Sequence, residues 1–407
     1  MSKYLRHLPS SLFTLVREIG RVADRAGIGA YLVGGIVRDI ILRRKNLDLD
    51  IVVEADAKVF AQKLAKKFKA KVTIHDAFGT ASLILPSHLR IDLATARKEY
   101  YPYSGALPVV EKGSFRDDLF RRDFTINAMA VCINRDAWDE LVDPYGGLLD
   151  LKEGRIRILH KESFKDDPTR LLRAVRFEQR FNFKIEKETL ALLKEAINEG
   201  YIQNVKPHRH FVEFKKLLNE PDPLRNLKRL AALKAAKINF SRAAQVHRYI
   251  QQLPAKHFAG LNKDKWFLYC LAVLEKVNSG AKFPFRKEER RSIQEIKKKA
   301  AIFRGLSVRR LNRSEIYKIL NRFSWYAIFY WAATASEGRV LERLERFLRH
   351  DSRTRLQING DDLKRLGLNT GREIGRILNE ILYQKIDGRI RTRQQALKLA
   401  EELIGKI

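Results

Sequence analysis

The stretch that decides the fold is LVGGIVRD at residues 32–39, followed by DLDIV at residues 48–52. The apolar residues before Gly34 predict a short strand, and the residues after Gly35 have the spacing of a helix. Glycines at this junction leave backbone N–H groups unobstructed at the start of the helix, and such groups bind phosphate. Arg38 falls on the first turn of the helix, where its planar fork would contact phosphate oxygens. The stretch therefore predicts an anion site between a strand and a helix.

Two carboxylates follow on the next predicted strand. Asp48 and Asp50 are two residues apart, so both side chains point from one face. Carboxylates this close repel each other unless a cation lies between them, and a hard divalent ion such as Mg²⁺ accepts the arrangement. Asp92, on a neighbouring predicted strand, is the candidate for a third carboxylate. A solvated strand face is the plainer interpretation of two aspartates alone, but the Gly-Gly turn before them makes the metal site more specific.

Two further motifs place charged side chains at short spacing. RRDFTINAMA at residues 121–130 sets Arg122 beside Asp123, a pair that can donate to and accept from ribose hydroxyls. The plainer interpretation is a helix start capped by Asp123.

DDPTRLLRAVRF at residues 166–177 begins a helix, with Asp167, Arg170 and Arg173 along one side. Asp167 and Arg170 would meet the Watson–Crick edge of a base, because cytosine and adenine both show an exocyclic amine and a ring acceptor. An ordinary ion pair between them is the alternative.

The rest of the chain predicts a mixed α/β part followed by helices. The expected helices of the first part are Ser10–Ala26, Ile36–Leu42 and Ala57–Phe68, and the expected strands are Tyr31–Val33, Asp48–Val53, Thr80–Leu85 and Leu89–Leu93. The residues from Arg97 to Arg116 show little periodicity and predict a loop. From about Phe164 onward the period is helical almost throughout.

The charge differs strongly between these parts. Residues 1–150 carry 23 basic and 19 acidic residues, a net of +4, which leaves 57 basic and 29 acidic, a net of +28, for residues 151–407. A large polyanion is the natural partner of such a cationic surface. A generally Lys- and Arg-rich proteome is the alternative explanation.

Composition excludes several classes of protein. A length of 407 residues, 45% hydrophobic and 31% charged, is typical of a globular chain of two to four domains. Two cysteines, Cys132 and Cys270, exclude a disulfide framework and a Cys-rich zinc site. No apolar run reaches the length of a membrane span, and the N-terminal residues lack the apolar core of a signal peptide, so we expect a cytoplasmic protein.

In this order, LVGGIVRD, DLDIV, IDLATARKEYY, RRDFTINAMA, LVDPYGG and DDPTRLLRAVRF resemble the motifs of the class II tRNA nucleotidyltransferase and bacterial poly(A) polymerase family. The family lies within the polymerase β-like nucleotidyltransferase superfamily. The resemblance implies an α+β fold, in which a head with a small mixed sheet is followed by an elongated all-helical neck, body and tail. The expected domains are a catalytic head at 1–155, a neck at 156–220, a body at 221–320 and a tail at 321–407.

The resemblance also implies roles for the matching residues. Asp48 and Asp50 would hold two Mg²⁺ ions, with Asp92 as a third catalytic carboxylate. The expected nucleotide-binding residues are Gly34, Gly35, Arg38, Arg122, Asp123, Asn127, Asp167, Arg170, Arg173 and Arg176. Among these, Arg122 and Asp123 would read the ribose 2′-hydroxyl, and Asp167 with Arg170 would accept CTP and ATP. The stretch from Arg97 to Phe120 lies where the family has a flexible loop that helps the enzyme switch from C to A.

Two positions depart from the family pattern. The neck motif usually begins Glu-Asp, whereas here it is Asp166-Asp167, and the first carboxylate is expected to orient Arg170. A glycine often seen after the Gly-Gly helix is replaced by Arg43. Near the C-terminus, the segments Ile358–Leu363, Gly371–Leu378 and Asp387–Leu403 resemble the tail of tRNA-specific members.

We therefore expect an enzyme that extends the tRNA 3′ end from CTP and ATP, with release of pyrophosphate. The acceptor arm of tRNA is the expected partner, and a companion CC-adding enzyme would be needed if the chain adds only A. Addition of CCA, of CC alone and of A alone remain open. A poly(A) polymerase is the first alternative, and an RNA-binding protein with an inactive head is the second.

Overall fold

The computed structural model describes residues 3–44, 48–236, 238, 240–252, 265–274, 283–368 and 371–405. The chain divides into two compact units. The first comprises Met1–Glu220 with Ala232–Ala236, and the second Pro221–Ala231 with Lys237–Ile407. The finer division into head, neck, body and tail stays a prediction.

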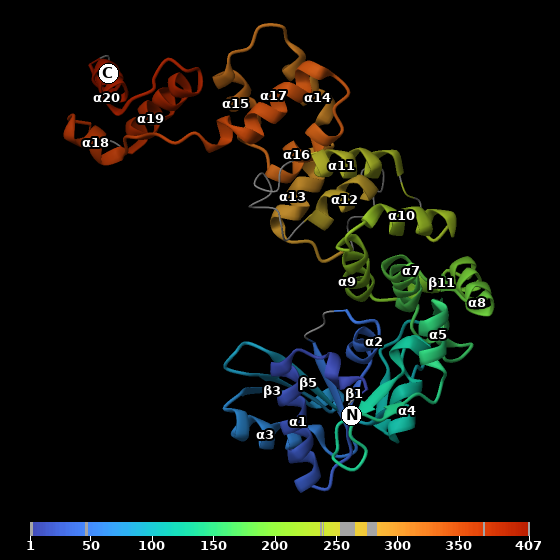
Figure 1. Ribbon diagram of the computed structural model, residues 1–407. Coiled ribbons are helices and arrows are strands. Elements are labelled where there is room, and N and C mark those ends of the chain that lie inside the picture. The colour runs from blue at the N-terminus through green and yellow to red at the C-terminus, as the bar shows by residue number, and fades with distance from the viewer. Residues whose placement is uncertain are drawn as a thin grey trace. The chain divides into compact units, whose positions relative to one another are not determined.

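A seven-stranded mixed sheet forms the centre of the first unit (Figure 1). Its strands, in the order β3-β4-β5-β2-β1-β8-β9, are β1 (Ala30–Val33), β2 (Leu49–Val53), β3 (Lys71–His75), β4 (Thr80–Ile84), β5 (Arg90–Thr95), β8 (Ala130–Cys132) and β9 (Leu141–Val142). Strands β2 and β5 are parallel, and the other neighbours are antiparallel.

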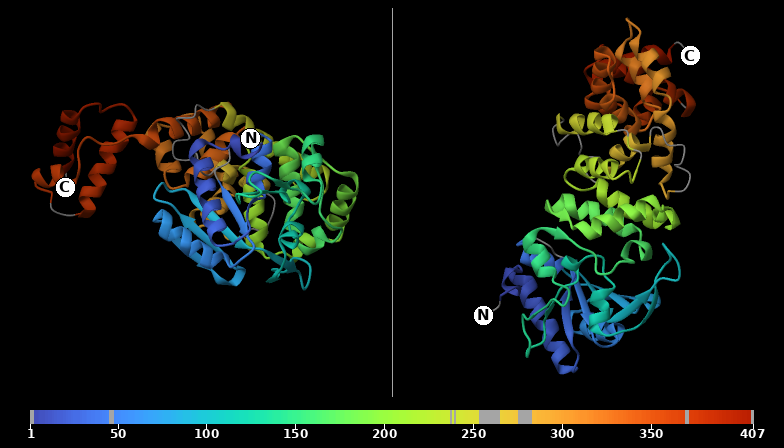
Figure 2. Two further views of the ribbon diagram at one scale, coloured as in Figure 1. Left: turned by 60° about the horizontal axis from the view of Figure 1, so that its bottom comes forward. Right: turned by 90° about the vertical axis from the view of Figure 1, so that its right-hand side faces the viewer.

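Helices cover the sheet and continue beyond it. The helices of the first unit before Leu218 are α1 (Ser10–Arg25), α2 (Gly35–Ile41), α3 (Ala57–Phe68), α4 (Phe115–Phe120), α5 (Gly147–Glu153), α6 (Ser163–Asp166), α7 (Thr169–Phe181), α8 (Lys187–Asn198) and α9 (Pro207–Leu218). Helix α3 packs on β3, β4 and β5, and α1 packs beside α3 (Figures 1 and 2). The predicted elements of this region are confirmed to within about two residues at each end.

The sheet has two different faces because side chains alternate along each strand. On β2, the buried Leu49, Ile51 and Val53 point to one face, and Asp50 and Val52 point to the other. Val52 belongs to a small apolar cluster with Val33, Ala96, Leu119 and Ala130. Asp48 and Asp50 therefore lie at the start of β2, near this apolar cluster.

One prediction about this unit is wrong. The residues from Arg97 to Arg116 do not form an irregular loop, because β6 (Arg97–Tyr100) pairs with β7 (Val109–Lys112) as an antiparallel hairpin. Charged side chains hide the alternation of the two strands, since Lys98 and Glu111 face each other across the pair as an ion pair of 2.8 Å. The residues between the strands, 101–108, are the part that remains a loop.

The second unit is helical throughout its described residues. Its helices are α10 (Pro223–Ala232), α11 (Phe240–Gln252), α12 (Lys265–Leu274), α13 (Lys287–Ile296), α14 (Lys299–Ser307), α15 (Arg313–Leu320), α16 (Trp325–Ala333), α17 (Gly338–Arg349), α18 (Gly360–Arg365), α19 (Gly371–Ile386) and α20 (Arg393–Ile404). Helices α12 and α16 are apolar and buried, whereas α17 has a buried stripe of Val340, Leu344, Phe347 and Leu348 beneath a charged surface. None of the described helices is long and apolar enough to cross a membrane.

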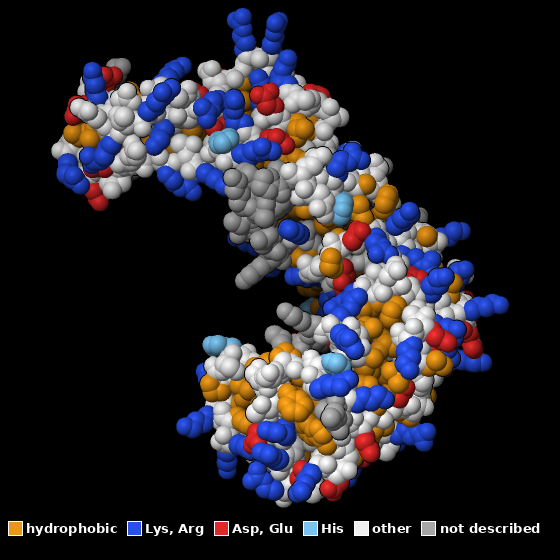
Figure 3. Space-filling model, viewed as in Figure 1, with side chains coloured by type: hydrophobic (Ala, Val, Ile, Leu, Met, Phe, Trp, Pro, Cys, Tyr) orange, Lys and Arg blue, Asp and Glu red, His pale blue; other side chains and the backbone are white. Residues whose placement is uncertain are grey.

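The last three helices have a core of their own. Leu363 of α18, Ile377 and Ile381 of α19, and Ala396 and Ala400 of α20 pack together and are buried. Lys and Arg side chains are spread over the visible surface of both units and outnumber the acidic ones (Figure 3). The two cysteines are free and buried.

Candidate functional site

A pocket of about 610 Å³ in the first unit brings the sequence-predicted residues together. All of the predicted site residues except Asp92 line it. Its lining contains eight basic side chains and six acidic ones. A polar pocket with an excess of positive charge suits a triphosphate group and is a poor site for an apolar ligand.

The Gly-Gly turn joins β1 to α2 at one wall of this pocket. Gly34 has φ +74° and ψ −128°, a conformation that essentially only glycine adopts, and Gly35 begins the helix. A β-carbon on Gly34 would stand 2.6 Å from Nη1 of Arg122. Glycine is therefore required here both by the backbone and by the guanidinium beside it.

Two of the predicted carboxylates, Asp50 and Asp92, lie on the same face of two neighbouring strands. Asp50 and Asp92 are register partners across the parallel pair β2 and β5. Burial, opposed by Arg122 but reinforced by Asp92 and Asp48, raises the pKa of Asp50 to about 6. A carboxyl that its surroundings disfavour as an anion is a fitting ligand for a cation that would restore its charge.

Asp92 is held by its own partners. It accepts from Oγ of Ser82 at 2.6 Å and from Nε of Arg90 at 2.9 Å. It lines an adjoining cavity of about 290 Å³, which shares Asp50 and Arg122 with the main pocket. Among the described residues, no group of three or more His, Cys, Asp or Glu has the arrangement of a complete metal site. Asp48 and Asp50 therefore fit Mg²⁺ as a pair of hard oxygen donors that leaves positions for substrate and water.

Arg122 and Asp123 point to different partners. Nη2 of Arg122 donates to Asp118 at 2.9 Å, and Asp118 is fully buried. Burial alone would raise the pKa of Asp118, but Arg122 and Arg121 lower it below its ordinary value. Asp118 thus fixes Arg122 beside Gly34. This fully buried carboxylate was missed because it falls in the stretch from Arg97 to Phe120, where a flexible loop was expected.

Asp123 belongs to a chain of buried polar side chains. It accepts from Nδ2 of Asn127 at 2.9 Å and from Nε of Arg173 at 2.8 Å. Burial would raise its pKa, but Arg173 and Asn127 lower it to about 2. The chain continues from Asn127 Oδ1 to Nη1 of Arg38, at 2.6 Å. Asp123 is therefore an anion at any physiological pH, and the role at the ribose stays a prediction.

The guanidinium of Arg38 already donates hydrogen bonds to neighbouring side chains, which the sequence did not predict. Its Nε and Nη2 donate to the two carboxylate oxygens of Asp39, at 2.9 and 3.0 Å. The guanidinium also lies over the rings of Phe177 and Phe181, 5.3 and 4.7 Å from their centres. Arg38 lines the pocket, but most of its donors are already used, so contact with a triphosphate stays a prediction.

Helix α7 supplies the other wall. Asp167 precedes the helix and accepts from Oγ1 of Thr169 at 2.7 Å, while Arg170 donates to Oγ of Ser163 at 2.5 Å and to the carbonyl of Arg121 at 2.7 Å. The predicted base-reading residues thus use separate partners and do not form an ion pair with each other. Asp166, the carboxylate expected to orient Arg170, lies 3.9 Å from Nε2 of His160. The side chain that accepts a hydrogen bond from Arg170 is instead that of Ser163.

Helix α9 contributes two charged residues that sequence reasoning missed. Arg173 and Arg176 both approach the buried Glu213, with contacts of 3.5 and 3.7 Å. Arg209 forms an ion pair with Asp167, with Nη2 at 3.0 Å from a carboxylate oxygen. The available signal was an acidic residue between Phe211 and Phe214, inside a stripe that is otherwise apolar.

The hairpin supplies two more residues of the pocket. Glu99 on β6 pairs with Arg121 at 3.1 Å and with Arg97 at 2.7 Å. Tyr101 follows the strand, and burial raises the pKa of its hydroxyl to about 12, so the hydroxyl keeps its proton. Both were missed because they fall in the stretch that was predicted to be an irregular loop.

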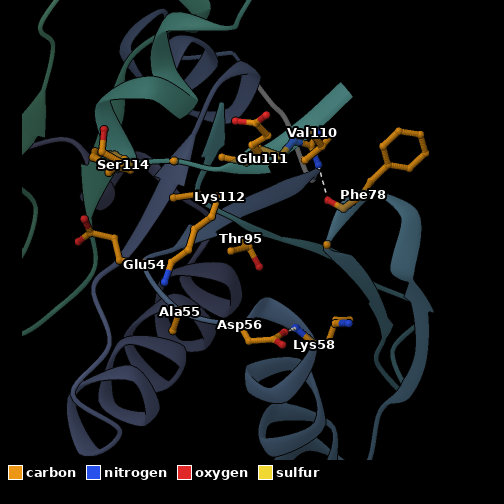
Figure 4. Close-up of a pocket in the computed structure, with 15 residues that line it drawn as sticks. Glu54, Ala55, Asp56, Lys58, Phe78, Thr95, Val110, Glu111, Lys112 and Ser114 are labelled. Atoms are coloured by element: carbon orange, nitrogen blue, oxygen red, sulfur yellow. Dashed lines mark hydrogen bonds between the residues drawn. The ribbon is translucent and has the colours of Figure 1, made fainter. Parts of the chain in front are cut away.

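A second cavity of about 600 Å³ lies at the opposite ends of β2 and β5 and contains none of the predicted residues. Glu54 and Asp56, between β2 and α3, line it together with Thr95 of β5, and residues of β7 also line it. Figure 4 shows the side chain of Lys112 reaching from β7 toward Ala55. The predicted chemistry therefore gathers in the polar pocket.

Comparison with known proteins agrees with this geometry. A family described as the poly(A) polymerase head domain matches residues 30–157, and one described as a probable RNA- and SrmB-binding site of polymerase A matches residues 182–245. An A-adding tRNA nucleotidyltransferase of Halalkalibacterium halodurans is 32% identical over 96% of this chain and 92% of its own length. Another from Geobacter sulfurreducens is 31% identical over 98% of this chain, which spans 48% of that longer relative.

Solved structures extend the similarity over the whole chain. The Thermotoga maritima CCA-adding enzyme in complex with tRNA is 33% identical, covers 99% of this chain and 97% of its own, and has a TM-score of 0.76. A CCA-adding enzyme in complex with ATP is 33% identical with the same coverage and a TM-score of 0.78. These similarities confirm the α+β fold, with a nucleotidyltransferase head and a helical remainder. From its head motifs to its last helices, the chain belongs to the tRNA nucleotidyltransferase and bacterial poly(A) polymerase family of enzymes.

Proposed function

We propose that this protein adds the terminal adenosine to tRNA ending in CC, and that it does so without a nucleic-acid template. One observation carries the proposal: Asp48 and Asp50, the Gly34 turn and the pair Asp167 and Arg170 all line a single pocket. Carboxylates for metal, a turn for phosphate and a donor–acceptor pair for a base are the three parts that nucleotidyl transfer needs. Addition of A is the step shared by A-adding and CCA-adding relatives, so it is the most specific reaction that both groups support.

In this account each wall of the pocket has its own task. Asp48 and Asp50 would hold Mg²⁺, which supplies charge neutralisation of the triphosphate and lowers the pKa of the primer hydroxyl. The backbone at Gly34 and Gly35 would hold phosphate oxygens together with Arg38. Arg122 and Asp123, which line the same pocket, would read the ribose 2′-hydroxyl. Asp167 would accept a hydrogen bond from the exocyclic amine of adenine or cytosine. Arg170 would donate a hydrogen bond to the ring nitrogen of the same base. The 3′-hydroxyl of tRNA then attacks the α-phosphorus, and pyrophosphate leaves.

Binding of tRNA would depend on the cationic remainder of the chain. Residues 151–407 carry the net charge of +28, and the phosphates of tRNA release counterions when they meet such a surface. The tRNA complex of the Thermotoga enzyme supports this partner. Whether CTP is also a substrate separates a complete CCA-adding enzyme from an A-adding one. Addition of CC alone is disfavoured because the hairpin of residues 97–112 is present and contributes Glu99 to the pocket.

Replacement of the carboxylates tests the reaction. In Asp48→Asn and Asp50→Asn, nucleotide addition should fall at least about a thousandfold, because the charge that holds the metal is lost. The affinity for tRNA should stay within about twofold of the wild type. The wild type should also be stabilised against heat by ATP only when Mg²⁺ is present. Wild-type turnover in either variant would overturn the assignment, and no Mg²⁺-dependent stabilisation would favour an RNA-binding protein with an inactive head.

A further inference from the structure

One guanidinium connects the base-reading carboxylate to the loop of the hairpin. Nη2 of Arg209, on α9, lies 3.0 Å from a carboxylate oxygen of Asp167. Nη1 of the same side chain donates to the carbonyls of Gly105 and Ala106, at 3.1 and 2.9 Å. The planar fork of arginine holds these bonds in a fixed relative geometry, and a single ammonium group would not reproduce them.

The tip of the loop also has a close steric fit to the neck. Gly105 is buried with φ +76°, and a β-carbon there would stand 2.9 Å from the carbonyl carbon and oxygen of Asn204. The flanking Tyr103 and Leu107 are 68% and 50% exposed. Gly105 and Ala106 are the buried residues of the loop, and their carbonyls are the ones that Arg209 binds.

Strand β6 of the hairpin reaches the other residue of the proposed base-reading pair, Arg170. Glu99 on β6 pairs with Arg121 at 3.1 Å, and the carbonyl of Arg121 accepts from Nη2 of Arg170 at 2.7 Å. The loop thus contacts Asp167 through Arg209, and Glu99 of β6 contacts Arg170 through Arg121. The hairpin is therefore connected at two places to Asp167 and Arg170. Its position depends on the positions of these two residues.

We propose that Arg209 is a positioning residue that makes docking of the hairpin loop and base selection by Asp167 depend on each other. This inference rests on the proposed function, since it concerns which nucleotide that pocket accepts. Without Arg209, Asp167 keeps its bonds to Thr169 but loses its cation, and the loop tip loses two charge-assisted hydrogen bonds. The carboxylate is then free to turn, and a base that offers a different edge is no longer rejected as strongly.

A double-mutant cycle tests the coupling. The variants are Arg209→Met, Gly105→Ala and the double variant, with Lys206→Met as a control that removes an exposed charge one turn away. On tRNA ending in CC, the ratio of kcat/KM for ATP to that for GTP should fall about tenfold in each single variant and no further in the double variant. Arg209→Lys should behave like Arg209→Met, whereas Lys206→Met should match the wild type. Additive effects, or unchanged discrimination in Gly105→Ala, would overturn the proposal.

Hydrogen exchange of the loop gives a readout that does not depend on activity. Without substrates, the amides of residues 103–108 should exchange about tenfold faster in Arg209→Met than in the wild type or in Lys206→Met, with the same thermal midpoint. Unchanged exchange would mean that Arg209 does not hold the loop. If the wild type added no nucleotide to any tRNA, the proposed function would fail, and the exchange rates would still decide whether the bridge exists.

Discussion

The guanidinium of Arg122 fills the space beside Gly34 that a side chain would need, with Nη1 only 2.6 Å from the position of a β-carbon. Asp118 holds that guanidinium in place from the other side. The turn that is expected to bind phosphate and the arginine that is expected at the ribose are therefore built as one unit. This relationship explains why the glycine and the arginine, 88 residues apart in the sequence, belong to one site.

Gly34→Ala should damage nucleotide binding directly. The backbone at Gly34 is strained for any other residue by about 1–3 kcal/mol, and the added methyl group would displace Arg122. We expect the KM for ATP to rise at least about tenfold, measured by single-nucleotide addition to tRNA.

Gly146→Ala is the control for this change. Gly146 also has positive φ, +72°, but a β-carbon there meets nothing within 4 Å. Gly146→Ala should lower the thermal midpoint of unfolding slightly and leave the KM for ATP unchanged. Equal effects of the two variants on KM would show that backbone strain alone, and not the position of Arg122, matters.

Arg170→Ala should relax the choice of nucleotide more than it weakens binding of tRNA. The side chain is buried and fixed by Ser163 and by the carbonyl of Arg121, so its remaining donors have a defined direction. We expect discrimination between ATP and GTP to fall by about one to two orders of magnitude, the size of a lost buried charge-assisted hydrogen bond. Arg180→Ala removes a charge from the same helix and pocket. It should lower the affinity for the nucleotide without changing the discrimination between ATP and GTP. Unchanged selection in Arg170→Ala would refute the role in base reading.

The stability of the protein should fall between about pH 6.5 and pH 4 in part because of His160. Burial, with a contribution from Arg170, lowers the pKa of His160 to about 4. In this window the unfolded chain binds a proton that the folded chain excludes, so the free energy of unfolding decreases as the pH falls. His160→Phe, which keeps a ring against Phe120, should flatten that decrease. Chemical denaturation at a series of pH values measures it, and an unchanged pH dependence in the variant would contradict the assignment.

The site was predictable from the sequence where its parts are local. A strand, two glycines and a helix define the turn at Gly34, and the spacing of Asp48 and Asp50 alone places both on one face. Arg43 has a φ of +52°, a conformation that favours glycine, and the family resemblance had indicated a glycine at this position.

The remainder depends on contacts between distant segments. Glu213 meets Arg173 from 40 residues away, and Arg209 meets Gly105 from 104 residues away, so no spacing reveals either pair. The spacing of Asp167 and Arg170 was compatible with an ion pair between them. Instead, Asp167 pairs with Arg209, and Arg170 donates to Ser163. The hairpin was missed because its outward side chains are charged on both strands, which removes the alternation that marks a strand.

The measurement that tests the central claim most directly uses three tRNA substrates, ending at the discriminator base, at C and at CC. Each is incubated with the protein and Mg²⁺, and with CTP, ATP or both, and the products are resolved to single nucleotides. We predict that the CC-ended tRNA gains one A from ATP and then stops. Addition of CCA to the tRNA that ends at the discriminator base would show that the enzyme also uses CTP. If that tRNA is not extended, the enzyme needs a companion that adds CC. Long A tails, addition that ends at CC, or no extension of the CC-ended tRNA would contradict the account.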